Sequence, residues 1–377
     1  MEVIFMREIN IASILVGKRK EKGITQDELA GYLGVSKAAI SKWETGQSYP
    51  DITLLPLLAA YFNISIDDLI DYKPQMVKED IRRLYVKLCK DFSEKPFDKV
   101  LAECEKIIKK YYACPALLVE MGSLLVNHNM LADSPEKSRE VLVMVRDLMI
   151  HVREETNDEY LLGVSVYMEA GCELYLDNPS AAMILLEDCN RPKASPEVIL
   201  ASALDRLGKK DKAIEVLQTM IYQNILLALA GFGNLIIEYA DREEKVDMWM
   251  HSFTQIAESM GLLEMHPGGL APMYLLAAEA YASHGQEQKA LVMLQKYTDI
   301  FTGDIFPLKL QGNKYFDQME NWFDMLGLGT NMPRCESVVK DSLMESVEKN
   351  PRLAPLFETD EFKHIVHQLR LKLLKQS

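Results

Sequence analysis

Residues 25–46 encode two short helices joined by a tight turn, and this segment constrains the fold more than any other stretch of the chain. Thr25 can cap the first helix, and Glu28, three residues later, completes a capping box. Gly34 supplies the left-handed backbone conformation that ends this helix. Ser36 can then cap the second helix. These residues predict a helix, a turn and a second helix in close succession.

The apolar residues of the segment fall at helical spacing. Leu29 and Leu33 share one face of the first helix, and Ile40 and Trp43 share one face of the second. Ala30 is small enough to let the second helix cross closely. The residues left pointing outward on the second helix are Lys37, Ala38, Ser41 and Lys42. An outward face this small and basic suits a groove of base edges flanked by phosphates.

Over roughly residues 8–70 the chain resembles the Xre family of phage-repressor and Cro-like helix-turn-helix domains. Gly34 at the turn and the run Ser-Lys-Trp-Glu-Thr-Gly at 41–46 carry the resemblance. It implies a five-helix domain that binds a double-stranded DNA operator. We expect this domain to occupy residues 1–72, because Pro74 disfavours a helix continuing through residues 71–74.

The resemblance also implies roles for individual residues. Gln26 is expected to anchor a phosphate at a helix N-terminus, and Arg19 is expected to form a structural ion pair with Glu44. The residues expected to face the bases are Ser36, Lys37, Ala38, Ser41 and Lys42. Many family members carry Gln where this chain has Ala38. Gln reads adenine through two hydrogen bonds whereas Ala can only touch a thymine methyl, so the operator sequence does not carry over.

The charge distribution of the chain favours contact with nucleic acid at one local site only. Residues 1–72 hold 7 Lys/Arg and 10 Asp/Glu, and they account for −3 of the net charge of −14. The other 305 residues therefore carry −11. The bulk of the chain repels nucleic acid, so we expect a modest, salt-dependent affinity for one domain that is raised by homodimerisation.

Cysteine usage and the apolar segments favour a cytoplasmic protein without a membrane partner. The six cysteines form no C-x-x-C pair, and residues 1–6 lack the pattern of a signal peptide. The longest apolar run, residues 225–237, is interrupted by Asn234 and is too short to span a bilayer. We predict a buried helix there.

From Val77 onward the pattern is helical and repeats itself. Ala201 precedes Ala213 by twelve residues and Ala278 precedes Ala290 by twelve, each pair with a glycine five before its second member. Close helix crossings need small residues, and glycine lets the chain reverse between helices. This resembles the tetratricopeptide repeat, in which helix pairs stack into a superhelix with a concave groove. A generic helical solenoid is the alternative.

The predicted fold class is therefore all-α. An N-terminal five-helix domain of the Xre type is followed by a tetratricopeptide-like α-solenoid over residues 73–377, which we expect to provide effector binding and dimerisation. No phosphate-binding loop, dinucleotide fingerprint or H-E-x-x-H motif occurs, so we predict no enzyme and no cofactor. Glu361, His364 and His367 share one helical face, but a solvated terminal helix is the favoured interpretation and no metal site is predicted.

A DNA-binding domain followed by helical repeats resembles the bacterial peptide-pheromone receptors. The resemblance implies a transcriptional regulator whose repeats bind a short peptide effector and set the geometry of a dimer. The repeat register places on the concave side Asn127, Tyr167, Ser202, Asp205, Glu238 and Glu279. An acidic groove of this kind would favour a peptide with a basic residue. The alternative is a DNA-anchored interaction protein whose repeats bind a protein partner.

Overall fold

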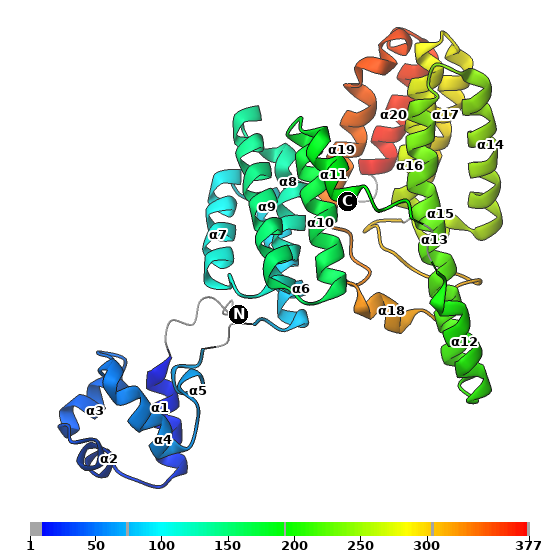
Figure 1. Ribbon diagram of the computed structural model, residues 1–377. Helices are drawn as coiled ribbons and strands as arrows, with labels where there is room; N and C mark the ends of the chain where they lie inside the picture. The colour runs from blue at the N-terminus through cyan, green and yellow to red at the C-terminus, as the bar shows by residue number, and fades with distance from the viewer. Residues whose placement is uncertain (1–9, 73–74, 192–193, 303–304, 375–377) are drawn as a thin grey trace. The chain divides into compact units, whose positions relative to one another are not determined.

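The computed structural model describes residues 10–72, 75–191, 194–302 and 305–374 (Figure 1). The described residues contain helices and no strand, and one isolated antiparallel bridge joins Lys309 to Asn331. The all-α prediction is confirmed. Residues 1–6, Lys73 and Pro74 lie outside the described residues, so the expectations about a leader sequence and about Pro74 concern positions that the structure does not describe.

The chain divides into two compact units. The first comprises Met1–Met76 with Tyr111–Cys114, and the second comprises Val77–Lys110 with Pro115–Ser377. The first unit contains α1 (Ile11–Glu21), α2 (Gln26–Leu33), α3 (Lys37–Glu44), η1 (Ile52–Leu54), α4 (Leu55–Phe62) and α5 (Ile66–Ile70). It has its own hydrophobic core, built around Leu15, Leu29, Ile40, Leu58 and Leu69, each with no exposed surface.

The second unit begins with a series of helices, each packed against its sequence neighbours. They are α6 (Lys78–Glu94), α7 (Phe97–Lys110), α8 (Pro115–His128), η2 (Asn129–Leu131), α9 (Pro135–Glu155), α10 (Glu159–Tyr175) and α11 (Pro179–Leu186). Contacts link α8 to α9, α9 to α10 and α10 to α11, as Figure 1 shows. This neighbour-to-neighbour packing is typical of a helical-repeat protein.

The rest of the second unit continues with longer helices. They are α12 (Pro196–Arg206), α13 (Lys210–Glu238), α14 (Glu243–Met260), α15 (Leu262–Met265), α16 (Pro267–Ser283), α17 (Glu287–Ile300), α18 (Glu320–Met325), α19 (Glu336–Glu348), η3 (Pro351–Leu356) and α20 (Asp360–Leu374). The segment between α17 and α18 is not helical in its described part. Tyr222, Phe253 and Tyr297 are among the fully buried residues of this half.

The two helix pairs expected from the sequence are present. Ala201 and Ala213 are buried where α12 meets α13, and Ala278 and Ala290 are fully buried in the pair α16 and α17. Gly208 at φ +72° and Gly285 at φ +70° lie in the reversals between the paired helices. Because L-residues avoid this backbone conformation, glycine is the residue that permits each reversal. The twelve-residue spacing of the alanines therefore identifies positions that are buried in paired helices.

The prediction of a buried helix at residues 225–237 is wrong. The run belongs to the 29-residue helix α13, whose most apolar 18-residue window is only 22% buried. Tyr222, Leu229 and Ile236 pack inward, whereas Leu227 is 69% exposed. By length and composition α13 could cross a membrane, but a helix that packs one face inside a protein meets the same criteria. An apolar composition does not determine how many neighbours a helix acquires.

Candidate functional site

The turn between α2 and α3 has the geometry that its sequence predicts. The hydroxyl of Thr25 accepts a hydrogen bond from the backbone N–H of Glu28 (3.2 Å), and the Glu28 carboxylate accepts one from the N–H of Thr25 (2.7 Å). Gly34 ends α2 at φ +69°, and the Ser36 hydroxyl caps α3 by accepting from the N–H of Ala39 (3.2 Å). Both caps and the glycine turn are confirmed.

Helix α3 has one buried and one outward face. Ile40 has no exposed surface and Trp43 is 5% exposed, so both anchor the helix to the core of the first unit. The expected base-facing residues Ser36, Lys37, Ala38 and Lys42 are exposed, and Ser41 is half-buried. The outward face carries hydroxyls, ammonium groups and one methyl group. These are groups that hydrogen-bond base edges, contact phosphates or pack against a thymine methyl.

Lys37 makes an ion pair with Asp27 on the preceding helix. The Nζ of Lys37 lies 2.8 Å from the Oδ2 of Asp27, and the two side chains are 60% and 65% exposed. Exposed pairs of this kind contribute about 0–1 kcal/mol, because water and salt compete with both partners. The pair can therefore open at little cost when Lys37 meets a different acceptor.

Glu44 joins α1, α2 and α3 through three hydrogen bonds. Arg19 donates to it from Nε (2.5 Å) and from Nη2 (2.9 Å), and Gln26 donates from Nε2 (2.9 Å). Burial opposes ionisation of this carboxyl, but the bonds from Arg19 and Gln26 outweigh burial and lower the pKa of Glu44. The ion pair between Arg19 and Glu44 is confirmed.

Gln26 lies where a phosphate-binding residue is expected, at the first position of α2. Its amide nitrogen carries two hydrogens and donates one of them to Glu44. This bond fixes the orientation of the amide at the positive end of the helix dipole.

The basic run at the end of α1 has separate partners for its lysines. Lys18 pairs with Glu21 (2.8 Å), and Lys22 donates to the backbone carbonyl of Tyr61 (2.5 Å) while lying over that ring. Lys20 is exposed. The run is thus partly structural, and a contiguous phosphate-binding patch is not evident from these contacts.

The structure distributes the six expected effector residues over five helices. Asn127 on α8 is half-buried and donates to the Ser123 carbonyl (2.9 Å). Tyr167 on α10 is 73% exposed, and Ser202, Asp205 and Glu238 are also exposed. Among the residues that the structure describes, no hydrogen bond or ion pair joins any two of these six. Their common groove remains a prediction.

Glu279 is the expected effector residue with the most intramolecular contacts. Its carboxylate accepts from the side-chain nitrogen of Asn350 (2.7 Å) and from Arg352 (3.1 Å), and its side chain is 12% exposed. The sequence held no signal for these contacts, because the partners lie more than seventy residues away. Any ligand would have to compete with both bonds.

Helix α10 has a feature that we did not predict from the sequence: its buried face carries carboxylates and its outward face is apolar. Glu169 and Glu173 are 5% and 8% exposed, and they pair with Arg153 and Arg146 of α9. The large apolar residues exposed on α10 are Tyr160, Leu162, Tyr167, Leu174 and Tyr175. The signal was available in the sequence as Tyr160, Tyr167 and Leu174 at seven-residue spacing, which places them on one face.

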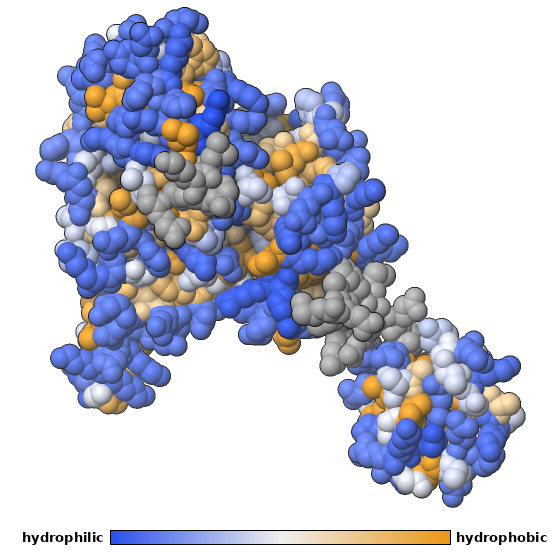
Figure 2. Space-filling model, turned by 180° about the vertical axis from the view of Figure 1, so that it is seen from behind, coloured by the Kyte–Doolittle hydropathy of each residue, from blue (hydrophilic) through white to orange (hydrophobic). Residues whose placement is uncertain are grey.

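Apolar side chains are exposed elsewhere in the second unit as well. Ile199 on α12 is 73% exposed, Leu207 directly after this helix is 70% exposed, and Met183 on α11 is 67% exposed. Figure 2 shows apolar residues in orange gathered among hydrophilic ones on the visible face of this unit. Exposed apolar clusters mark surfaces that bind a partner or ligand.

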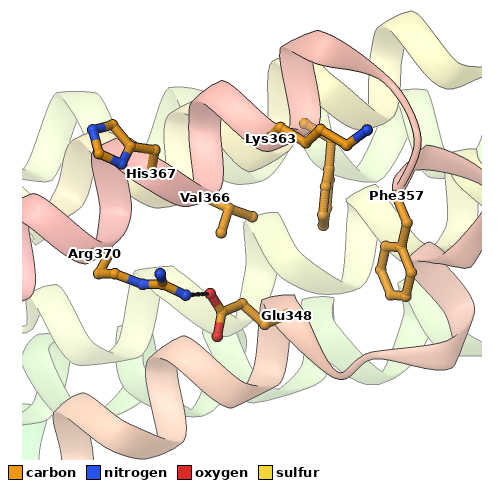
Figure 3. A pocket seen from close by; sticks show the side chains of 7 residues that line it. Glu348, Phe357, Lys363, Val366, His367 and Arg370 are labelled. Carbon is orange, nitrogen blue, oxygen red and sulfur yellow. Dashed lines mark hydrogen bonds and ion pairs between the residues drawn. The ribbon is translucent and has the colours of Figure 1, made fainter.

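A cavity of about 440 Å³ opens between α19, η3 and α20 (Figure 3). Arg370 and Glu348 form an ion pair on one side, and Phe357, Lys363 and His367 lie around the opening. No group of three or more potential metal ligands occurs in the described part of the chain.

Comparison with known proteins places a family match on the first unit. The helix-turn-helix family matches residues 18–69, so this segment forms a helix-turn-helix domain. The HTH-type transcriptional activator BcrR of Enterococcus faecalis is 44% identical over 52 residues. This match covers 14% of the present chain and 26% of BcrR, so the chain spans about a quarter of that relative.

One solved structure was matched along most of its length. Bacillus thuringiensis PlcR, crystallised with the peptide PapR7 and DNA, aligns with 98% of this chain and 96% of its own at 14% identity. The TM-score is 0.21. A score this low gives no information about how the present chain is arranged or what it binds.

Proposed function

We propose that this protein is a sequence-specific DNA-binding transcriptional regulator whose helical-repeat unit senses an effector. The observation that carries the proposal is the outward face of α3, held in place by a buried Ile40 and Trp43 and by a capped turn. Such a regulator acts where the DNA is, in the cytoplasm, and no enzymatic activity or cofactor is part of the proposal.

In the proposed complex α3 enters the major groove. Lys37 leaves Asp27 and donates to the O6 and N7 acceptors of a guanine, while the methyl group of Ala38 packs against a thymine methyl. Ser36, Ser41 and Lys42 contact neighbouring base edges or phosphates. Gln26 donates its second amide hydrogen to a phosphate while Glu44 holds the first. The phosphate contacts fix the register and the base contacts select the sequence.

The proposed active form is a homodimer. The first unit has few cations and a net negative charge, so one domain alone can make only a small number of phosphate contacts. Two domains spaced by about 34 Å meet successive major grooves and multiply the affinity. Ile52, 78% exposed, and Leu57, 48% exposed, supply apolar surface on the first unit that supports a contact between copies.

The proposed effector is a short peptide bound in part by the outward face of α10. Tyr160, Tyr167 and Leu174 follow one another at intervals of about 10 Å along the helix, which is close to three residues of an extended chain. The exposed carboxylates of Asp205 and Glu238 would favour a basic side chain in the peptide. The peptide would act by population shift, favouring one curvature of the repeats and so one separation of the two DNA-binding domains.

A protein partner is the second candidate occupant. The seven-residue spacing of Tyr160, Tyr167 and Leu174 is also the spacing at which one helix packs along another. In that case the protein would be a DNA-anchored interaction protein. The length of the occupant distinguishes the two, because an extended peptide spans the row with about seven residues whereas a helix needs about fifteen.

The first experiment measures binding of the purified full chain to its own upstream DNA by fluorescence anisotropy at fixed salt. It is repeated with a concentrated small-molecule and peptide extract of the host culture. We expect tight, sequence-selective binding that the extract changes. Selective binding that ignores the extract would favour the protein partner, and binding without selectivity would contradict the regulator itself.

A variant pair then tests the effector surface. Tyr167→Ala should abolish the effect of the extract while leaving DNA affinity in its absence unchanged. Tyr315→Ala, which alters an aromatic residue 46% exposed elsewhere in the unit, is the matched control. If the extract changes the DNA affinity of the two variants equally, α10 is excluded as the effector surface.

A further inference from the structure

The cavity between α6 and the segment that leads into α19 contains two cysteines from distant parts of the chain. Cys89 lies on α6 and is 6% exposed, while Cys335 is the N-cap of α19 and is partly exposed. Both line a cavity of about 320 Å³, together with Tyr85, Lys309 and Arg334. A small molecule in this cavity would therefore meet a sheltered thiol and a more accessible one.

Side chains of α6 hydrogen-bond to backbone carbonyls of the segment that leads to Cys335. The Tyr85 hydroxyl donates to the Pro333 carbonyl (2.9 Å), and the Cys89 thiol approaches the same carbonyl (3.8 Å). One turn earlier on α6, Arg82 donates from Nε to the Gly327 carbonyl (2.8 Å). These bonds fix α6 against the segment that ends at Cys335, and both cysteines line the same cavity.

The two thiols differ in chemical character. Burial and the neighbouring Cys335 sulfur raise the pKa of Cys89 to about 12, so this thiol stays protonated. Burial also opposes ionisation of Cys335, but hydrogen bonds from the Ser337 side chain, the Val338 N–H, Ser93 and Cys89 outweigh it and lower the pKa of Cys335. The thiolate is the reactive form of cysteine. The more accessible member of the pair, Cys335, is therefore also the more nucleophilic one.

We propose that Cys335 and Cys89 form an oxidative modification site, at which hydrogen peroxide or another small hydroperoxide converts the pair into a disulfide. The Cys335 thiolate attacks one peroxide oxygen, the O–O bond breaks, and hydroxide leaves and takes up a proton to become water. Cys335 then carries a sulfenic acid. The Cys89 sulfur attacks that sulfur, an S–S bond of about 2 Å forms, and the second water leaves with the Cys89 proton.

The bond would tie α6 to the start of α19. Two thiols lose two electrons and two protons, peroxide is reduced to two waters, and a thiol reductant reverses the change. Cys104 and Cys172 are buried thiols that lack a lowered pKa, since burial raises the pKa of Cys104 to about 12 and that of Cys172 to about 11. The site is independent of the proposed function, since it involves no residue assigned to DNA or effector binding.

The test uses the intact wild-type chain. The reduced protein is treated with an equimolar amount of hydrogen peroxide, its remaining thiols are alkylated, and tryptic peptides are identified by mass spectrometry. We expect the peptide Leu88–Lys90 linked to the peptide Cys335–Lys340, and we expect dithiothreitol to release both. Absence of the linked pair with both thiols still alkylated, or linkage of Cys335 chiefly to the exposed Cys189, would overturn the proposal.

Variants separate the two roles. In Cys89→Ser the sulfenic acid on Cys335 should persist and be captured by dimedone, whereas in Cys335→Ser the thiol of Cys89 should remain unmodified. Cys104→Ser, which removes a buried thiol outside the cavity, is the matched control and should form the linked peptides like the wild type. Capture of dimedone on Cys89 in Cys335→Ser would show that the assigned order is wrong.

Discussion

Arg19 and Glu44 lie 25 residues apart and are joined by two hydrogen bonds, at 2.5 and 2.9 Å, with side chains 15% and 5% exposed. Arg19 also donates to the carbonyl of Ile24 (3.0 Å). One guanidinium therefore holds the end of α1, the loop before α2 and the end of α3 together. The orientation of α3, the helix that we propose enters the major groove, depends on this contact.

Arg19→Ala should destabilise the first unit by about 2–3 kcal/mol, because it leaves the buried Glu44 carboxylate without its main partner. The change is measured as the melting temperature of a fragment of residues 1–76, which holds its own core. Lys20→Ala removes a neighbouring exposed cation and is the control. Equal melting temperatures would show that the ion pair contributes nothing to the fold.

Stability of the same fragment should fall in acid. The folded-state pKa of Glu44 is lowered, so its contribution is fully present above the ordinary carboxyl pKa of about 4.3 and is lost as pH falls through the lowered value. Urea unfolding followed by Trp43 fluorescence, from about pH 6 down to about pH 3 so as to bracket the ordinary carboxyl pKa, measures this loss of stability. Glu44→Gln should show a weaker dependence over this range, and an unchanged slope would assign the effect to other carboxylates.

Gly34→Ala should cost about 1–2 kcal/mol, because alanine strains at φ +69° although its Cβ would meet no atom within 4 Å. Gly31 provides a matched control: it lies inside α2, its added Cβ also meets nothing, and its φ is not positive. Gly31→Ala should stabilise the helix by about 0.5–1 kcal/mol. Chemical unfolding measures both changes in the free energy of unfolding. Changes of opposite sign would verify that backbone conformation, and not crowding, selects glycine at the turn.

Lys37→Ala should relax base preference at one operator position and weaken binding to the preferred sequence by about 1–3 kcal/mol. Gln26→Ala should weaken all sequences alike, since a phosphate contact carries no sequence information. Selection of bound sequences from a randomised pool distinguishes the two outcomes. Unchanged selectivity in Lys37→Ala would remove that residue from base reading.

Lys42→Ala should lower the salt dependence of DNA binding. If Lys42 contacts a phosphate, its removal reduces the slope of log affinity against log salt concentration by about 1. Lys18→Ala is the control, because Lys18 is paired with Glu21 on α1. If the slope of log affinity against log salt concentration changes equally in both variants, the effect comes from the overall charge of the domain and not from a phosphate contact of Lys42.

The local features of the first unit were predictable because each depends on residues a few positions apart. The capping box at Thr25, the turn at Gly34 and the cap at Ser36 follow from backbone geometry that short-range sequence specifies. The pair of Arg19 with Glu44 is long-range, and it followed from the family resemblance. The spacing of Ala278 and Ala290 likewise identified a helix pair, since close crossings require small residues.

The all-α class, the helix-turn-helix segment and the small-residue helix pairs can be predicted from the amino-acid sequence, because caps, glycines and periodicity act within one or two helices. Which helix faces are covered depends on tertiary packing. The apolar run in α13 is largely exposed, α10 buries Glu169 and exposes Tyr167, and Cys89 and Cys335 line one cavity. Burial is a property of what packs against a helix, and the residues that pack are distant in the chain.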